Sequence, residues 1–333
     1  MDERALLETL AAGPTSGADL ARATGLTRAA VWKRIEALRE AGVEIQARPG
    51  EGYALARPTQ LLDSEAIAAA LAPEVRARIT SIDVAWSIDS SNSELLRQQP
   101  AADGMTDVLL AERQTGGRGR RGRNWASPLA AHLYLSVSRT FAGGLVRLGG
   151  LSLVAGIAAV EALHAQGFTQ VRLKWPNDLV VPDGDVLRKL GGVLVEGGGE
   201  HAGPVRAVIG LGLNVSMPSA TGATIDQPWC DLAQLSPASD PPLRNRIAAS
   251  MLDRWLPALD EFDAAGLAPF LGRYAALDAL KMRAVALHEG TVRTAVALGL
   301  AADGALRVRT ADGREHSVHS GEVSVRCVAG SPA

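Results

Sequence analysis

An arginine- and glycine-rich tract constrains the fold of this chain more than any other segment. From Gly116 to Arg123 it reads Gly-Gly-Arg-Gly-Arg-Arg-Gly-Arg, and the stretch from Glu112 to Trp125 holds five arginines and a single acid. Each glycine costs a helix about 1 kcal/mol relative to alanine, so a stable helix is excluded here. Arginine binds carboxylate and phosphate oxygens through two parallel hydrogen bonds, and glycine lets the backbone approach them closely. The tract therefore predicts a loop that becomes ordered over a bound anion.

Two other interpretations of this arginine loop remain open: a disordered RNA-binding segment and a solvated surface loop. The flanking segments, at residues 108–111 and 133–137, are apolar and strand-like, which favours a loop inside a folded domain. The net charge of −2 over 333 residues argues against a protein that coats nucleic acid generally. Any nucleic-acid contact must come from a local patch.

The first 57 residues have the pattern of a winged helix-turn-helix. Leu6, Leu7 and Leu10 mark a first helix, and Ser16 caps a second, in which Leu20 and Ala23 are expected to face inward. Gly25 ends that helix, and Thr27 caps a third with Val31, Ile35 and Leu38 on one face. Residues 43–45 and 53–55 then alternate around Pro49-Gly-Glu-Gly52, which predicts a hairpin.

The rest of the chain predicts two further regions. A bridging helix is expected at residues 61–71, a long helix at 151–165 and more helices at 243–262. Strands are expected at residues 108–111, 133–137, 171–174, 192–196 and 205–210. This mixture predicts an α+β domain with helices on one face of its sheet. Short alternating runs from about residue 281 to 328 predict a small β-barrel. The expected domains are residues 1–60, 61–278 and 279–333.

Composition narrows the classes of protein. Cys230 and Cys327 lie far apart without neighbouring ligands, so neither a disulfide framework nor a zinc site is expected. The longest apolar stretch, at residues 151–160, is too short to cross a bilayer, and the acidic N-terminus is unlike a secretory signal. We therefore expect a cytoplasmic protein without a membrane partner.

Four segments together resemble the signature motifs of biotin–protein ligases. They are Gly117-Arg-Gly-Arg-Arg-Gly122 with Trp125, Lys174-Trp-Pro-Asn-Asp178, Arg188-Lys-Leu-Gly-Gly-Val-Leu-Val-Glu196 and Gly210-Leu-Gly-Leu-Asn214. They occur in the family's order and spacing, and the resemblance is closest to the bifunctional ligases that also repress the biotin operon. It implies a class II synthetase-like mixed α/β ligase domain between the winged helix-turn-helix and an SH3-like β-barrel. It also implies biotin and ATP as substrates, with Mg²⁺ accompanying ATP.

The resemblance assigns one group of residues to biotin. Burying the ureido ring of biotin requires hydrogen-bonding partners, which hydroxyl and amide side chains supply. This chain has Ser91 where the family usually has threonine, which keeps the hydroxyl and loses a methyl contact. Ser90 or Ser91 would equally suit a helix N-cap. The residues assigned to biotin are Ser90, Ser91, Asn92, Gln114, Arg118, Gly119, Arg120, Lys189, Gly210 and Gly212.

A second group is assigned to ATP and catalysis. Lys189, with Arg118 and Arg120, is the expected electrostatic catalyst, because an ammonium between the biotin carboxylate and the α-phosphate offsets their repulsion. Trp175 is expected to form an apolar wall, while Asn177 and Asp178 either position pyrophosphate or form an Asx-turn. The metal ligands stay unknown. The residues assigned to ATP or the adenylate are Arg118, Arg120, Arg121, Trp125, Lys174, Asn177, Lys189, Asn214 and Arg326. The resemblance implies that Gly321 and Glu322 help to bind ATP or contact the catalytic domain.

The third N-terminal helix is a candidate for DNA recognition. Residues 1–57 hold eight Lys or Arg against eight Asp or Glu, so binding would be local and dependent on a homodimer. The alternative is a helical domain kept only for packing. The residues expected to contact operator DNA are Thr27, Arg28, Ala29, Lys33 and Arg34.

The resemblance also implies an acceptor, the biotin carboxyl carrier protein, whose lysine receives the biotinyl group. A lipoate–protein ligase and a non-catalytic transcription factor that senses biotin remain as rival functions. The arginine loop and the helix-turn-helix favour biotin over lipoate, and Lys189 with the loop arginines favours an enzyme.

Overall fold

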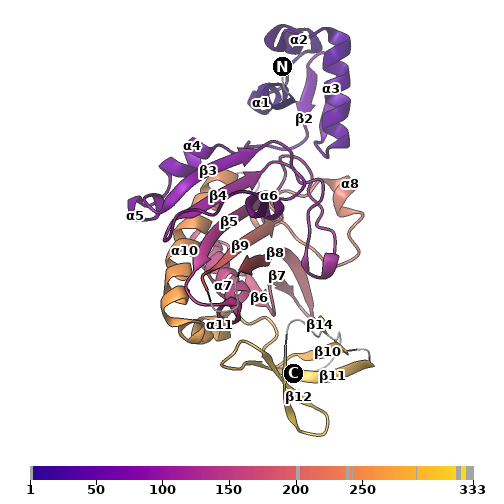
Figure 1. The fold of residues 1–333 in the computed structure, drawn as a ribbon. Coiled ribbons are helices and arrows are strands. Elements are labelled where there is room, and N and C mark those ends of the chain that lie inside the picture. The colour runs from indigo at the N-terminus through magenta and orange to yellow at the C-terminus, as the bar shows by residue number, and fades with distance from the viewer. Residues whose placement is uncertain are drawn as a thin grey trace.

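The computed structural model describes residues 3–199, 203–237, 241, 243–289, 291–319 and 324–327. Three parts follow one another along the molecule in Figure 1: an N-terminal helical domain at the top, a central sheet with its helices, and a smaller sheet at the bottom. The prediction of a winged helix-turn-helix, a central α+β domain and a C-terminal β domain is confirmed.

The N-terminal domain is stabilised by the caps that the sequence predicts. The Ser16 hydroxyl accepts a hydrogen bond from the Asp19 amide at 3.1 Å, Thr27 accepts from the Ala30 amide at 3.2 Å, and Gly25 ends the second helix with φ 67°. Leucine, isoleucine and valine side chains from all three helices form the core. The elements are α1 (Glu3–Ala12), α2 (Gly17–Thr24), α3 (Arg28–Glu40), β1 (Ile45–Arg48) and β2 (Gly52–Leu55).

Two local predictions in this region are wrong. Ala23 is exposed, and Thr24 lies on the buried face instead, one turn after Leu20, where its hydroxyl donates to the Leu20 carbonyl at 2.6 Å. The helix expected over residues 61–71 is only α4 (Ser64–Ala69). Asp63 caps that helix by accepting from the Ala66 amide at 3.0 Å, so the residues before it remain extended.

The central sheet has seven strands in the order β3-β4-β5-β9-β8-β7-β6, all antiparallel except the β3–β4 pair. Four of the five predicted strands are longer than expected, β6 is one residue shorter, and β3 and β7 were not predicted. The strands are β3 (Ile79–Ala85), β4 (Thr106–Ala111), β5 (Leu133–Phe141), β6 (Arg172–Lys174), β7 (Asp178–Asp183), β8 (Val186–Gly199) and β9 (Val205–Leu213).

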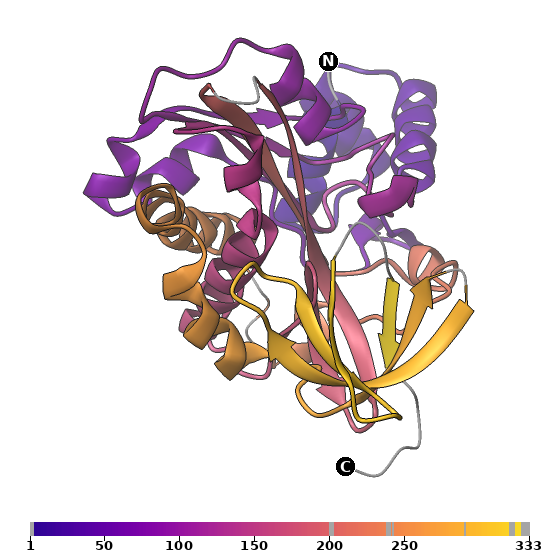
Figure 2. The same cartoon turned by 60° about the horizontal axis from the view of Figure 1, so that its bottom comes forward.

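Two long helices cover one face of this sheet, as Figure 2 shows. They are α7 (Leu151–Ala165), with the predicted bounds, and α10 (Arg244–Ala265), one continuous helix where several were expected. The Trp255 indole of α10 donates to the Ala155 carbonyl of α7 at 2.9 Å. Smaller elements are α5 (Pro73–Arg76), α8 (Ser219–Gly222), α9 (Leu232–Leu235), α11 (Leu271–Leu277) and 3-10 turns at Arg120–Gly122, Leu145–Leu148 and Ala268–Phe270.

Alternation along β5 and β9 separates a core face from a second face. Leu135 and Leu211 belong to the core beneath α7 and α10, whereas Ser136, Gly210 and Gly212 point to the other side. The short helix α6 (Ser91–Arg97) packs there against β4, β5 and β9. Helices therefore occupy both faces, not one as predicted, and the second face is left partly open beside α6.

The C-terminal part is an antiparallel sheet in the order β13-β12-β11-β10-β14. The closure of these strands into an SH3-like β-barrel stays a prediction. Its strands are β10 (Ala284–Glu289), β11 (Thr291–Leu300), β12 (Leu306–Thr310), β13 (Glu315–Val318) and β14 (Ser324–Cys327). It contacts the central domain where the Trp175 indole donates to the Gly304 carbonyl at 3.0 Å. None of the helices in the described part of the chain combines the length and apolarity needed to cross a lipid bilayer.

Candidate active site

A cleft opens on the second face of the central sheet, between the arginine loop, the start of α6 and strands β7, β8 and β9. Its position follows from the alternation described above, which turns small and polar residues of β5 and β9 toward this side. The lining residues are Ser90, Ser91, Asn92, Gln114, Arg118, Gly119, Arg120, Arg123, Asn124, Trp125, Asn177, Asp178, Lys189, Gly192, Val193, Leu194, Gly210, Leu211, Gly212 and Gln227.

The floor of the cleft is a chain of hydrogen bonds. The Ser136 hydroxyl lies 2.7 Å from both the Ser91 hydroxyl and Asn92 Oδ1. Gln114 Oε1 accepts from the Ser91 amide at 2.8 Å, which leaves the Gln114 amide nitrogen to donate elsewhere. Ser91, Asn92 and Ser136 are buried, Gln114 is half-buried, and all four are hydrogen-bonded, so the floor is held in place before any ligand binds.

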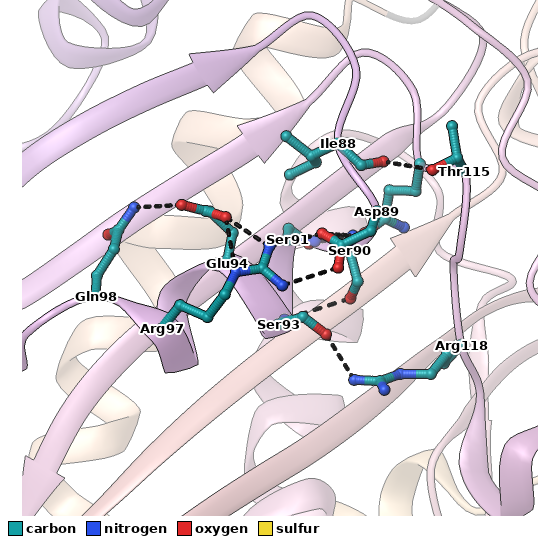
Figure 3. Close-up of polar contacts among 11 residues, drawn as sticks. Ile88, Asp89, Ser90, Ser91, Ser93, Glu94, Arg97, Gln98, Thr115 and Arg118 are labelled. Atoms are coloured by element: carbon teal, nitrogen blue, oxygen red, sulfur yellow. Dashed lines mark hydrogen bonds and ion pairs between the residues drawn. The ribbon is translucent and has the colours of Figure 1, made fainter.

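Ser90 serves as the N-cap of α6 as well as lining the cleft (Figure 3). Its hydroxyl accepts from the Ser93 amide at 3.4 Å. Just before it, Asp89 receives two hydrogen bonds from Arg97, at 2.8 and 2.9 Å, which lower the pKa of that carboxyl. The N-cap interpretation of this segment and its placement in the site are therefore compatible.

The two site-facing glycines of β9 make room for other side chains of the cleft. A Cβ on Gly210 would lie 2.3 Å from Asn92 Oδ1, and one on Gly212 would lie 2.6 Å from Trp125 Cε2. From the sequence, these glycines were expected to let the backbone approach a ligand ring closely. In this structure Asn92 and the Trp125 indole occupy the space that the glycines leave.

Lys189 brings a positive charge into the cleft from β8. Its Nζ is 2.7 Å from Asp178 Oδ1, and it lies 5.4 Å from the centre of the Trp125 ring. Leu190 is an extra residue in the β7–β8 pairing, so Lys189 and Gly192 face the same side. The backbone is held as well, because the Lys189 amide donates to the Pro228 carbonyl at 2.9 Å and the Cys230 amide donates to the Lys189 carbonyl at 3.0 Å.

The arginine loop covers the cleft and contributes Arg118, Arg120 and Arg123 to its lining. Arg118 Nη2 donates to Ser93 Oγ at 2.8 Å and to Glu196 Oε1 at 3.1 Å, which anchors the start of the loop to α6 and β8. For Arg120, burial and the neighbouring Arg121 lower the pKa, against the attraction of Asp178. Like charges brought together in a half-buried loop favour binding of an anion, which would offset their repulsion.

The structure brings all ten residues assigned to biotin into the lining of one cleft. Of those assigned only to ATP, Trp125 and Asn177 line it, whereas Arg121, Lys174 and Asn214 do not. Asn214 instead donates to the Cys230 carbonyl at 3.0 Å and so supports the backbone around Lys189. Arg326 lies on β14, but its side chain is outside what the structure describes, as are Gly321 and Glu322.

The interpretation of Trp175 as a wall of the site is wrong. Its side chain is buried, and its indole nitrogen donates to the Gly304 carbonyl, so it packs beneath the C-terminal sheet. Sequence analysis also missed Ser136 and Gln227. A serine in the apolar strand at 133–137 was a usable signal for Ser136, whereas nothing in the sequence around Gln227 distinguishes it from an ordinary loop residue.

The third helix presents the side chains expected to contact DNA. Arg28, Ala29 and Lys33 are exposed, and Thr27 is exposed at the helix cap. Arg34 is also exposed but lies 3.4 Å from a Glu3 carboxylate oxygen. An exposed cationic face on the second helix of a helix-turn-helix fits insertion into the major groove.

Comparison with known proteins gives consistent matches along the chain. The model of the Biotin/lipoate A/B protein ligase family matches residues 85–214, an HTH domain model matches residues 3–54, and the Biotin protein ligase C terminal domain matches residues 284–326. The bifunctional ligase/repressor BirA of Escherichia coli is 38% identical over 93% of this chain and 92% of its own length.

Two further relatives support this match. The biotin–[acetyl-CoA-carboxylase] ligase of Paracoccus denitrificans is 31% identical over 68% of this chain and 93% of its own length. The solved structure of the biotin protein ligase from Aquifex aeolicus in complex with biotin and ATP has a TM-score of 0.61 at 25% identity. It covers 75% of this chain and 100% of its own.

Proposed function

Because this chain belongs to the biotin–protein ligase family, we propose that its cleft binds biotin and ATP and joins them as biotinyl-5′-AMP. The biotinyl group then passes to a lysine of an acceptor protein. The observation that carries this proposal is the placement of Lys189 and the arginine loop over a polar, hydrogen-bonded floor. Such a site suits a ligand with a polar ring at one end and an anion at the other.

The residues of the cleft divide between the two ends of the ligand. Ser91, Asn92 and Gln114 would meet the ureido ring, and Lys189 with Arg120 would meet the carboxylate and the α-phosphate. When the carboxylate oxygen attacks the α-phosphorus, the bond to pyrophosphate breaks and a mixed anhydride forms. Lys189 offsets the repulsion between the two anions and then stabilises the charge that develops on phosphorus. The acceptor amine attacks the anhydride carbonyl, and AMP leaves.

The donor set of the cleft fits Mg²⁺ that arrives with ATP. Asp178 supplies one carboxylate to the lining of the cleft. The described residues contain no cluster of three His, Cys, Asp or Glu, so the protein side chains in this part of the chain form no complete metal site of their own. Mg²⁺ is commonly held by one or two carboxylates and by substrate phosphates. It would supply charge neutralisation on the triphosphate, and Asp178 with Asn177 would hold it. Lys174, Arg121, Asn214 and Arg326 remain proposed contacts of ATP or of its adenylate.

We expect Arg120→Gly to release biotinyl-5′-AMP about 10- to 100-fold faster than the wild-type chain, because a charged hydrogen bond to the adenylate is lost. The freed anhydride would label lysines on bystander proteins. Retention of radiolabelled adenylate during gel filtration measures the effect, with Arg314→Gly, an exposed arginine in the turn between β12 and β13, as the control. Normal retention by Arg120→Gly would refute the role of the loop.

We propose that the acceptor is a biotin carboxyl carrier protein, which the name of the Paracoccus relative supports. The domains would be residues 1–60 for DNA, 61–278 for catalysis and 279–333 for the C-terminal β domain. Winged helix-turn-helix domains commonly read operators as pairs of half-sites, which supports a homodimer. The need for ATP, and for DNA as a second partner, supports a cytoplasmic location.

We further propose that the N-terminal domain represses transcription in response to biotin. Adenylate that orders the loops of the cleft would favour the DNA-binding state of the dimer. In a gel-shift experiment with the upstream DNA of biotin genes, biotin and ATP together should tighten binding. Lys33→Ala should weaken it about tenfold, with Lys281→Ala as the control. Equal binding with and without biotin and ATP would exclude the coupling.

A further inference from the structure

Glu196 connects three elements that surround the cleft. It extends from β8, the strand that also carries Lys189, and its side chain is 28% exposed. One carboxylate oxygen accepts from Asn92 Nδ2 in α6 at 2.9 Å, and the other accepts from Arg118 Nη2 in the arginine loop at 3.1 Å. A single side chain therefore joins the floor of the cleft to its cover.

The carboxylate of Glu196 and the Leu194 carbonyl together determine how the amide of Asn92 is oriented. An ionised carboxylate only accepts hydrogen bonds, so Asn92 must turn its NH₂ group toward Glu196. The same NH₂ group donates to the Leu194 carbonyl at 3.2 Å. Asn92 Oδ1 then faces Ser136, whose hydroxyl donates to it at 2.7 Å and lies 2.7 Å from the Ser91 hydroxyl. The orientation set by Glu196 thus extends to the cleft-lining serine.

Glu196 also anchors the arginine loop. Arg118 Nη2 is shared between Glu196 and Ser93 Oγ, which lies 2.8 Å away on α6 and is drawn with Arg118 in Figure 3. The backbone of Arg118 pairs with Asn124, so fixing Arg118 fixes the two sides of the loop together. The guanidinium of Arg118 therefore points toward α6 and β8. Arg120 lies two residues further along the loop.

We propose that Glu196 is a positioning residue for the biotin end of the site. It orients Asn92 and anchors Arg118, so that the floor and the arginine loop keep a fixed geometry for the ureido ring. Glu196 does not contact the reacting atoms. This inference rests on the proposed function and assigns a role to a residue that lies outside the set expected to touch either substrate.

The proposal predicts an effect on one substrate. In Glu196→Gln the carboxylate charge is lost, so the hydrogen bond from Asn92 becomes a neutral one and the ion pair with Arg118 becomes a weaker hydrogen bond. The Leu194 carbonyl alone then holds the Asn92 NH₂ group with a partner that can only accept. We expect the KM for biotin to rise about tenfold, the size of effect expected for a hydrogen bond to a charged group. Lys189 keeps its own partner Asp178, so the KM for ATP and kcat should change much less than the KM for biotin.

The matched control is Glu161→Gln on α7. Glu161 is also a partly exposed glutamate paired with an arginine: its side chain is 30% exposed and its Oε2 lies 2.6 Å from Arg273 Nη2. It belongs to the opposite face of the sheet and lines no part of the cleft. The same chemical change there should leave the KM for biotin unaltered.

Biotin-dependent exchange of pyrophosphate into ATP, measured on the full-length chain, tests the inference. A rise in the KM for biotin in Glu196→Gln, smaller when the substitution is made in Asn92→Ala, would support it. An unchanged KM for biotin, or equal losses for biotin, ATP and kcat, would overturn it. Should Glu196→Gln fail to fold, Glu196→Asp keeps the charge but draws the carboxylate back from Asn92 and Arg118, and an unchanged KM for biotin there would overturn the inference. Absence of exchange in the wild-type chain would instead refute the proposed function, and the inference with it.

Discussion

Replacing Lys189 with glutamine is expected to lower the rate of biotinyl-adenylate formation about 10³-fold at saturating substrates. The ammonium lies 2.7 Å from Asp178 and faces the cleft, where the carboxylate of biotin and the α-phosphate must approach each other. Glutamine keeps most of the length of the side chain but removes the charge that offsets this repulsion. Single-turnover formation of the adenylate, followed by rapid quench, measures the rate.

The control for this experiment is Lys281→Gln, which removes an exposed lysine outside the cleft. Its rate should match that of the wild-type chain. Thermal unfolding should show that both variants remain folded. A loss of less than about tenfold in the rate of Lys189→Gln would contradict the proposal that the charge of this lysine stabilises the transition state.

Arg244→Leu is expected to lower the free energy of unfolding by about 3–5 kcal/mol. Arg244 is 2% exposed, and its Nη1 lies 2.7 Å from Oε2 of Glu112, which is 0% exposed. Glu112 also accepts from the Leu62 amide in the segment that follows the N-terminal domain. Removing the arginine leaves a buried carboxylate without its counter-charge. Urea unfolding followed by circular dichroism measures the loss.

Arg273→Leu provides the comparison, since it breaks an ion pair with Glu161 whose two side chains are 32% and 30% exposed. That pair is screened by solvent, so we expect a change of about 0–1 kcal/mol. Removing both buried partners, in Glu112→Leu with Arg244→Leu, should restore part of the lost stability. If Arg244→Leu and Arg273→Leu lowered the free energy of unfolding equally, burial would not explain the effect of Arg244→Leu.

The parts of the fold that depend on local patterns were predictable from the sequence. Helix α7 has the predicted bounds because a largely apolar segment begins directly after Gly149-Gly150 and ends before Gly167. The caps at Ser16 and Thr27 and the stop at Gly25 are also local effects, and all three are present. The residues assigned to biotin by resemblance lie around one cleft because they either follow β3 and β4 or lie on the paired strands β8 and β9.

Features that depend on tertiary contacts could not be read from the sequence. Trp175 looked like a wall of the site, but the C-terminal sheet supplies the Gly304 carbonyl that holds it elsewhere. The link from Glu196 to Asn92 and Arg118 joins residues 104 and 78 positions apart, so no local pattern could indicate it. The pairing of Lys189 with Asp178 likewise depends on the extra residue in β8 that sets the direction of the lysine.

Transfer of radiolabelled biotin to a biotin carboxyl carrier domain tests the central claim most directly. The full-length chain, supplied with biotin, Mg²⁺ and ATP, should label the carrier, and replacing the acceptor lysine by arginine should abolish the label. Lipoate in place of biotin should give no product. A carrier that stays unlabelled, or one modified equally well with lipoate, would contradict the account.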